Sequence, residues 1–387
     1  MSEASRPLGL WTAIALVAGN MIGSGVFLLP ASLAAFGDTA GFVIAWSYWV
    51  SIWCANAAIA VAFAGSMGAL FPALIGTPAR AAACALAALW LCCAINLVGV
   101  REAGRLQVLT TALKVLPLLV FGGIAIWMID PRNLEPMSET AARSGIDMVM
   151  TAAGAVHTTV ALTLWAFLGL EAATIPAAAI RDAERTIPRA TMIGTLLAGI
   201  ATILACTAVL GVLPPDVAER STAPMADAAR TLWGDGAGHA IAAVAAVSCF
   251  GALNGWVLLS AQLPMAAAED GLFPRAFAIT DARGTPWFGV LIGTALASLL
   301  VVANYSDSLV KVFTFSILLS TAATLLPYVA SSAAWLKLGQ RGLVVAGFAL
   351  LYSLYALFGT GMEALAWGAA LIVAGLPLHY AIKARRR

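Results

Sequence analysis

Charged residues are scarce in this sequence. Only 10% of its 387 residues are Asp, Glu, Lys or Arg, whereas soluble domains carry about 25%. Hydrophobic residues make up 61% of the chain, and the mean hydropathy is +0.93. This composition excludes a soluble protein and predicts an integral membrane protein with several spans. A net charge of +2 gives no reason to expect a nucleic-acid partner.

Residues that bind metals or form disulfides are few, and their spacing suits neither purpose. The three histidines are scattered, and the six cysteines lie in apolar segments without the spacing of a metal site or a disulfide framework. His157 belongs to no motif that would complete a catalytic dyad. We therefore expect no metal, no cofactor and no enzymatic activity.

Eleven apolar runs are long enough to cross a bilayer, which takes about 20 residues per helix. All of them should be helices, because an open sheet edge is not viable in lipid. They predict an all-α membrane protein that forms one transmembrane domain, with polar loops at 130–148 and 213–236. The runs lie near 8–36, 41–71, 79–100, 105–129, 150–180, 189–213, 237–267, 286–303, 309–335, 343–358 and 363–382.

Lysine and arginine fall mainly on one set of connections. Four loops and the C-terminal tail contain 13 of them, and the alternate connections contain six. Since basic residues favour the cytoplasmic side, the tail at 383–387 should be cytoplasmic. The second run must then cross outward, and only residues 37–41 join it to the first. Eleven full spans would thus place the N-terminus outside. The five basic segments are 101–105, 181–189, 275–283, 337–341 and 383–387.

The middle of the first run is poorly suited to a plain spanning helix. The stretch GNMIGSGVFLLP at 19–30 holds three glycines, and each Gly costs about 1 kcal/mol relative to Ala inside a helix. A broken helix at this depth presents free N–H groups to a bound anion such as a carboxylate. Close helix packing through small residues is an equal alternative.

A second interrupted stretch lies in the fifth run. LTLWAFLGLEAATIP at 162–176 has a central glycine and a later proline, and it carries Glu171 at membrane depth. Two interrupted segments in corresponding positions indicate a transporter site between repeats. An ionisable residue inside the membrane is a functional candidate, although Glu171 could instead hold helices together.

Several motifs, in this order along the chain, resemble the amino acid–polyamine–organocation superfamily, and within it the arginine/agmatine and basic amino acid/polyamine antiporters. The resemblance implies a five-plus-five inverted repeat with alternating access. It places the first repeat at about 8–129, the second at about 150–335 and extra helices at about 343–382. It also implies a multi-pass protein of the inner membrane, an arginine-like amino acid substrate and homodimerisation. The motifs are GNMIGSGVFLLP (19–30), LWAFLGLEAATIP (164–176), RDAERTIPRAT (181–191), STAPMADAAR (221–230), CFGALNGWVLL (249–259) and AAAEDGLFP (266–274).

The resemblance assigns roles to individual residues. The backbone around Ile22, Ser24 and Gly25 would bind the substrate carboxylate, and that between Trp165 and Gly169 would accept from its α-ammonium. Trp165 would also gate the site, with Glu171 as a gating or coupling carboxylate. Substrate-facing positions on later spans are Ile52, Asn56 and Trp256, and the Trp256 face suits a guanidinium.

Two positions depart from the arginine/agmatine antiporter. Lys114 lies about 13 Å into the fourth run at 1.5 Å per residue, where it resembles the lysine that replaces sodium in sodium-independent members. It could carry protons as a coupling residue, or extend toward the cytoplasmic interface. Ile52 replaces a smaller residue. Both departures favour a neutral amino acid permease or exporter as the alternative function.

The largest departure is a missing helix. Relatives place a second span between Pro30 and Tyr48, and this chain passes directly from Gly37 to Asp38. Restoring one span would return the N-terminus to the inside. The charge distribution and the resemblance therefore both indicate that one helix has been deleted. A further alternative is therefore a transport-impaired form that retains only a binding or partner role.

Overall fold

The computed structural model describes residues 38–98, 116–134, 156–157, 159–167, 182–281, 284–304, 308–339 and 342–384. Within these residues the chain forms helices joined by turns, with no strand. The prediction of an all-helical protein is thus confirmed for this part of the chain. The long helices are α3 (Asp38–Leu70), α4 (Pro78–Val98), α8 (Ala183–Val212), α11 (Asp235–Glu269), α12 (Trp287–Ala303), α13 (Leu309–Lys337), α14 (Leu343–Gly359) and α15 (Met362–Ala384).

Six of these helices are long and apolar enough to cross a membrane: α3, α4, α8, α11, α13 and α15. Three more apolar helices are shorter, namely Leu116–Met128, α12 and α14. Each coincides with an apolar run in the sequence. The first run and most of the fifth lie outside the described residues, so the count of eleven spans stays a prediction.

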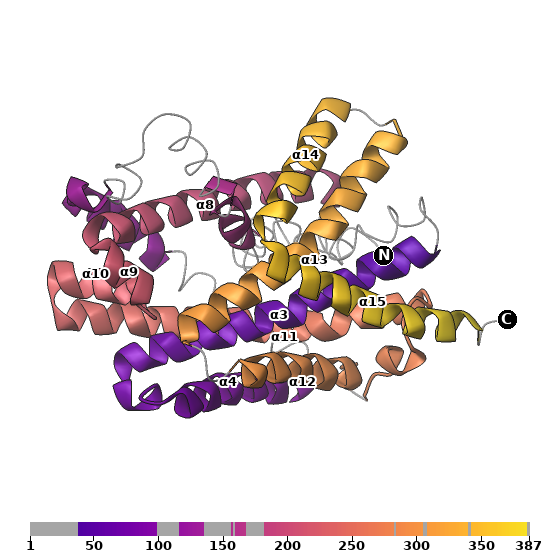
Figure 1. Ribbon diagram of the computed structural model, residues 1–387, viewed down its shortest axis with the longest axis horizontal. Coiled ribbons are helices and arrows are strands. Elements are labelled where there is room, and N and C mark those ends of the chain that lie inside the picture. Colours follow the sequence, from indigo (N-terminus) through magenta and orange to yellow (C-terminus); the bar gives the residue numbers. More distant parts are fainter. Residues whose placement is uncertain are drawn as a thin grey trace.

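Helix α3 runs through the middle of the molecule (Figure 1). It makes its most extensive contacts with α11 and α13, and it also touches α4, α12 and α15. In its most apolar stretch 83% of the residues are buried, against 17% in α15. A helix that is apolar all round is expected to be enclosed by other helices. Polar side chains on α3 therefore face protein rather than lipid.

Side-chain contacts define the two ends of this bundle. At the start of α3, Thr39 Oγ1 lies 3.2 Å from His379 Nε2 of α15, and the Phe42 and Phe273 rings are 5.8 Å apart. At the opposite end, the residues after Leu70 approach Thr222 and the start of α13, and together they line one cavity. The loop after Phe273 and the C-terminal helix thus share an end, in agreement with the lysine and arginine distribution.

The prediction of a polar loop at 213–236 is wrong in part, because this segment contains two short helices. It contains α9 (Pro215–Arg220) and α10 (Pro224–Trp233). Small buried residues of α10, including Ala228 and Ala229, pack against Val209 of α8 in a separate apolar cluster. Proline at the start of each helix is well tolerated, because the first turn leaves its N–H groups unbonded.

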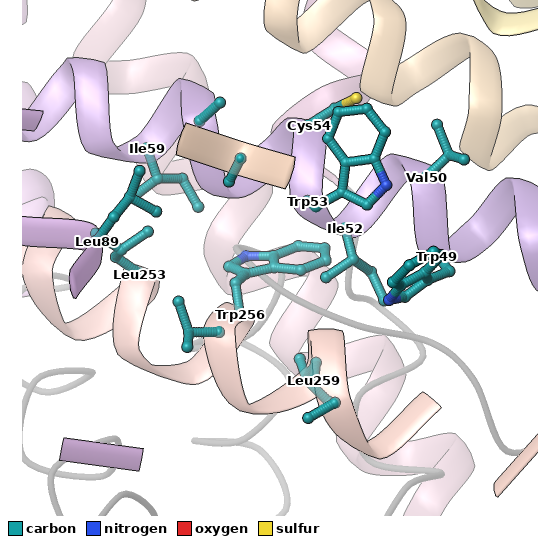
Figure 2. Packing of buried hydrophobic residues seen from close by; sticks show 14 of the residues in the cluster. Trp49, Val50, Ile52, Trp53, Cys54, Ile59, Leu89, Leu253, Trp256 and Leu259 are labelled. Carbon is teal, nitrogen blue, oxygen red and sulfur yellow. The ribbon is translucent and has the colours of Figure 1, made fainter. Parts of the chain in front are cut away.

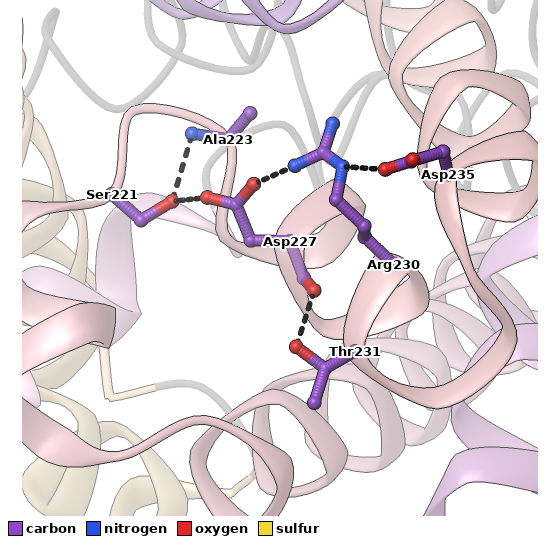
Figure 3. A network of polar contacts seen from close by, with 6 residues as sticks. All are labelled: Ser221, Ala223, Asp227, Arg230, Thr231 and Asp235. Atoms are coloured by element: carbon purple, nitrogen blue, oxygen red, sulfur yellow. Dashed lines mark hydrogen bonds and ion pairs between the residues drawn. The ribbon is translucent and has the colours of Figure 1, made fainter.

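A polar network joins α10 to the start of α11 (Figure 3). Arg230 lies 2.5 Å from Asp227 and its Nε lies 3.3 Å from Asp235. Asp227 also accepts a hydrogen bond from the Ser221 hydroxyl at 2.5 Å. Ser221 Oγ in turn accepts from the backbone N–H of Ala223 at 3.2 Å. The network fixes the turn before α10 as well as the turn after it.

Candidate functional site

Asn56 lies in the middle of α3 with none of its surface exposed. Neither its amide nitrogen nor its amide oxygen has a hydrogen-bond partner within the described part of the chain. Leaving a buried polar group unpaired costs about 1–3 kcal/mol. Asn56 is therefore a poor residue for a core position and a suitable one for a position that meets a ligand.

Ile52 lies one turn before Asn56, and Trp256 lies on α11. Figure 2 shows Ile52 extending toward the Trp256 indole across the interface of the two helices. Ile52 is 0% exposed, Trp256 is 3% exposed, and both belong to the main apolar cluster. The Trp256 Nε1 also lacks a partner among the described residues. Residues about 200 positions apart, predicted to share a site, thus lie together.

Trp165 reaches the same cluster from a third segment. It ends the helical residues 159–165, is partly buried and packs against the cluster that contains Ile52 and Trp256. Its ring meets Phe313 of α13 edge-on, with ring centres 5.7 Å apart. Its Nε1 has no partner within the described ranges. Ile52, Trp165 and Trp256 thus lie in or against one cluster, and Asn56 is buried one turn from Ile52 on the same helix.

The remaining predicted site residues lie outside the described part of the chain. The structure therefore leaves their predicted roles untested. They are Ile22, Ser24, Gly25, Lys114, Gly169 and Glu171.

Two further polar side chains were not singled out from the sequence. Trp53 follows Ile52, is 6% exposed, and its Nε1 has no partner among the described residues. Ser316 of α13 is fully buried, and its hydroxyl likewise has no partner there. One turn further along α13, Ser320 Oγ donates to Ser51 O of α3 at 2.9 Å. In the sequence, these residues could be recognised only as polar side chains within apolar runs. For serine this is weak evidence of a functional site.

A proline in α11 explains another polar contact with α3. Pro264 has no N–H, so the Ser260 carbonyl one turn earlier loses its helical donor. Trp49 Nε1 donates to this carbonyl at 2.8 Å. Gly289 and Gly293 of α12 lie against Ala261 and Ser260 at distances that leave no room for a Cβ. The bond therefore stabilises α11 where three helices meet.

The described residues offer little for a metal or a large cofactor. They contain no group of three His, Cys, Asp or Glu side chains that could hold a metal ion. A cavity of about 220 Å³ lies at the Leu70 end of α3, with Val61, Ala85, Thr222 and Val312 in its walls. None of the four described site residues lines this cavity. Its walls are mostly apolar, so it does not extend the candidate site.

Comparison with known proteins gives the family. Residues 30–374 match the amino acid permease family. The chain is 29% identical to a putative arginine/ornithine antiporter of Bacillus subtilis, over 88% of this chain and 86% of that protein. It is 29% identical to the cadaverine/lysine antiporter of Escherichia coli, over 79% and 77%. It is 27% identical to the putrescine transporter PotE of Escherichia coli, over 100% and 98%.

The alignment with PotE also measures a difference in length. It extends over 441 residues, and this chain has 387, so at least 54 aligned positions have no residue here. Because the alignment includes 98% of PotE and all of this chain, the unmatched positions are internal. Their number exceeds the roughly 20 residues of one spanning helix. The chain belongs to the amino acid permease family and is a multi-pass membrane transporter of amino acids or polyamines, not an enzyme.

Proposed function

We propose that this protein exchanges a cationic amino acid for a second cationic amino acid or amine by alternating access. The names of the relatives support this class, because they include arginine, ornithine, lysine, cadaverine and putrescine. The observation that carries the proposal for this chain is Asn56. Its whole amide is buried and without a partner among the described residues. It lies one helical turn from Ile52, which extends toward the Trp256 indole.

The chemistry of the four described site residues suits a substrate with a cationic end. The Asn56 oxygen can accept from an ammonium or guanidinium, and the Trp256 face attracts a cation by about 0.5–2 kcal/mol. These residues supply no carboxylate, so the cation is held by dipoles and an aromatic face. We assign the substrate carboxylate to the backbone around Ser24 and Gly25, near the free N–H groups of the predicted helix break.

Coupling is assigned to the ionisable residues predicted at membrane depth. Glu171 and Lys114 remain the candidates, with Trp165 as the gate over bound substrate. Exchange requires only that the loaded carrier reorient faster than the empty one. Proton coupling would require one of these two groups to change its charge during the cycle.

Asn56→Leu tests the binding site, because leucine has nearly the same shape and no polar atoms. We expect the dissociation constant for ornithine to rise at least tenfold, measured by titration calorimetry in detergent. The melting temperature should rise, since the substitution removes from the core an amide that has no partner in the described part of the chain. Thr195→Val is the matched control. It removes from α8 a hydroxyl that has no partner among the described residues, so it should also stabilise the fold, and it should leave binding unchanged.

The outcome of this test separates the proposal from its alternatives. Unchanged ornithine affinity in Asn56→Leu would mean that Asn56 is only a core residue. Binding of leucine with no competition by ornithine, lysine or putrescine would establish the neutral amino acid permease instead. Either result contradicts the proposed site or its proposed substrate.

We further propose that the internal deletion removes the second span, between Pro30 and Tyr48. The difference in length from PotE supports the loss of at least one span, and the parity of the basic loops supports its absence before the second run. Inserting the second span of PotE there should raise arginine or ornithine exchange in proteoliposomes at least tenfold, with binding changed less than threefold. An apolar insert of the same length and scrambled order is the control.

Full exchange by the parent chain, equal to that of the restored form, would contradict the need for this helix. Binding without exchange in the parent, rescued by the insert, would identify the chain as a transport-impaired form of the exchanger.

A further inference from the structure

Two fully buried asparagines meet between α4 and α11. Asn96 and Asn254 are each 0% exposed. Asn96 Nδ2 lies 3.1 Å from Asn254 O and 3.0 Å from Asn254 Oδ1. It also lies 2.9 Å from Cys92 O, one turn earlier in its own helix. Since a carboxamide has two N–H hydrogens, Asn96 can donate to its own helix and to α11 at once.

A second contact repeats this pattern one turn away. Cys92 Sγ lies 3.9 Å from Phe250 O, within reach of a weak S–H donor. Cys92 and Asn96 are four residues apart on α4, and Phe250 and Asn254 are four residues apart on α11. Residues four apart lie on one face of a helix. Two successive turns of α4 therefore contact two successive turns of α11, which fixes both the axial register and the rotation of α11.

The rotation of α11 determines where Trp256 points. Trp256 follows Asn254 by two residues, which is about 200° around a helix of 3.6 residues per turn. Asn254 faces α4, and Trp256 projects from the other side toward Ile52 of α3 (Figure 2). A rotation of about 10° would move a ring about 6 Å from the helix axis by about 1 Å. Such a shift is enough to spoil a binding geometry.

We propose that Asn96 is a positioning residue, which holds Trp256 in its substrate-facing orientation through Asn254. The inference rests on the proposed function, because it takes Trp256 as part of the substrate site. Asn96 itself bonds to α11, and the proposal gives it no contact with the substrate. Asn96 could also serve only to hold α4 against α11, and its replacement would then lower stability without a specific effect on Trp256. The test must therefore distinguish this structural role from the positioning of Trp256.

A double-mutant cycle makes that separation. The four proteins are the parent, Asn96→Leu, Trp256→Leu and the double variant, and the measured quantity is the ornithine dissociation constant in detergent. We expect Asn96→Leu to raise the dissociation constant at least fivefold in the parent. In the Trp256→Leu background it should change the constant less than twofold, because the residue that it positions is already gone.

Three further variants test whether the effect is specific to the Asn96 carboxamide. Cys92→Ser retains a donor at the neighbouring turn and should bind ornithine as the parent does. Asn96→Ser, a smaller change, replaces Asn96→Leu if the latter unfolds, and melting temperatures are recorded for every protein. Asn96→Gln retains the carboxamide and should recover part of the affinity lost in the leucine variant.

Equal fold-changes in the two backgrounds would overturn the positioning role while leaving Trp256 in the site. An unchanged dissociation constant in Asn96→Leu would overturn it as well. If Trp256→Leu alone has no effect, the proposed site is wrong, and the positioning inference falls with it.

Discussion

We expect Ile52 to set the length of the substrate that the proposed site accepts. Its side chain is completely buried and extends toward Trp256. Ile52→Ala removes three carbon atoms from that position. Arginine is larger than ornithine by three heavy atoms, so the change frees about the space that a guanidinium requires beyond an ammonium. The parent should therefore prefer ornithine, and Ile52→Ala should accept arginine.

The expected size of the effect follows from the fit of apolar pockets. One methylene group too many or too few changes discrimination by about 1–3 kcal/mol, or roughly 10–200-fold. We expect Ile52→Ala to increase the ratio of kcat/KM for arginine to that for ornithine by at least about tenfold. The assay is uptake of labelled arginine or ornithine into proteoliposomes preloaded with putrescine. It uses the form that carries the restored second span if the parent binds without flux.

Ile59→Ala is the matched control. Ile59 lies on the same helix and is 3% exposed, but Figure 2 shows it beside Leu89 and Leu253, away from Trp256. Both substitutions empty a core position, and such changes cost about 2–5 kcal/mol of stability. A shift in preference that appears only in the Ile52 variant is therefore a property of the site, not of weakened packing.

An unchanged preference in a stable, active Ile52→Ala protein would refute the reasoning. The reasoning would also be refuted if Ile52→Ala and Ile59→Ala lost the same activity toward arginine and ornithine alike. Ile52 would then be an ordinary core residue. If Ile52→Ala does not fold, Ile52→Val removes one methyl group and should shift the ratio in the same direction by a smaller factor.

Two further predictions concern stability. Trp49→Phe leaves the Ser260 carbonyl without either donor, so it should destabilise the fold by about 1–3 kcal/mol, whereas Trp46→Phe should cost less. The Trp46 indole donates at 2.9 Å to Leu371 O of α15. No proline occupies the position that donates to this carbonyl within the helix, so the carbonyl keeps its helical donor when Trp46 is replaced. Thermal unfolding in detergent compares the stabilities of the Trp49→Phe and Trp46→Phe variants. Arg230→Gln should cost under about 1 kcal/mol, because the Arg230 side chain is 33% exposed, and the loss should shrink at high salt.

The positions of the spans could be predicted because lipid imposes a length on every apolar helix. The run at 41–71 became α3 (Asp38–Leu70), and the run at 286–303 became α12 (Trp287–Ala303). Short helices were not predicted in 213–236, because that segment is polar and helices of this length are unstable alone. α10 exists because its alanines pack against α8, which is a tertiary contact that local sequence does not encode.

The site was only partly accessible from the sequence, for a similar reason. Trp256 and Asn56 were identified through a family resemblance, since nothing in hydropathy distinguishes them from other mid-span residues. Pro264 in the sequence implies an unbonded carbonyl at Ser260. It does not reveal that the donor is Trp49, on a helix 211 residues away. Register between helices decides such contacts, and register depends on all side chains of the interface.

The location of the proposed site on α3 bears on what the proposed deletion would leave intact. α3 makes its main contacts with α11 and α13, and these helices also carry Trp256 and the Phe313 that meets Trp165. All of these contacts are made by helices that this chain retains. We therefore expect the part of the proposed site that binds a cationic end to persist while reorientation between the two faces is impaired. Loss of the second span should lower the rate of exchange far more than the affinity.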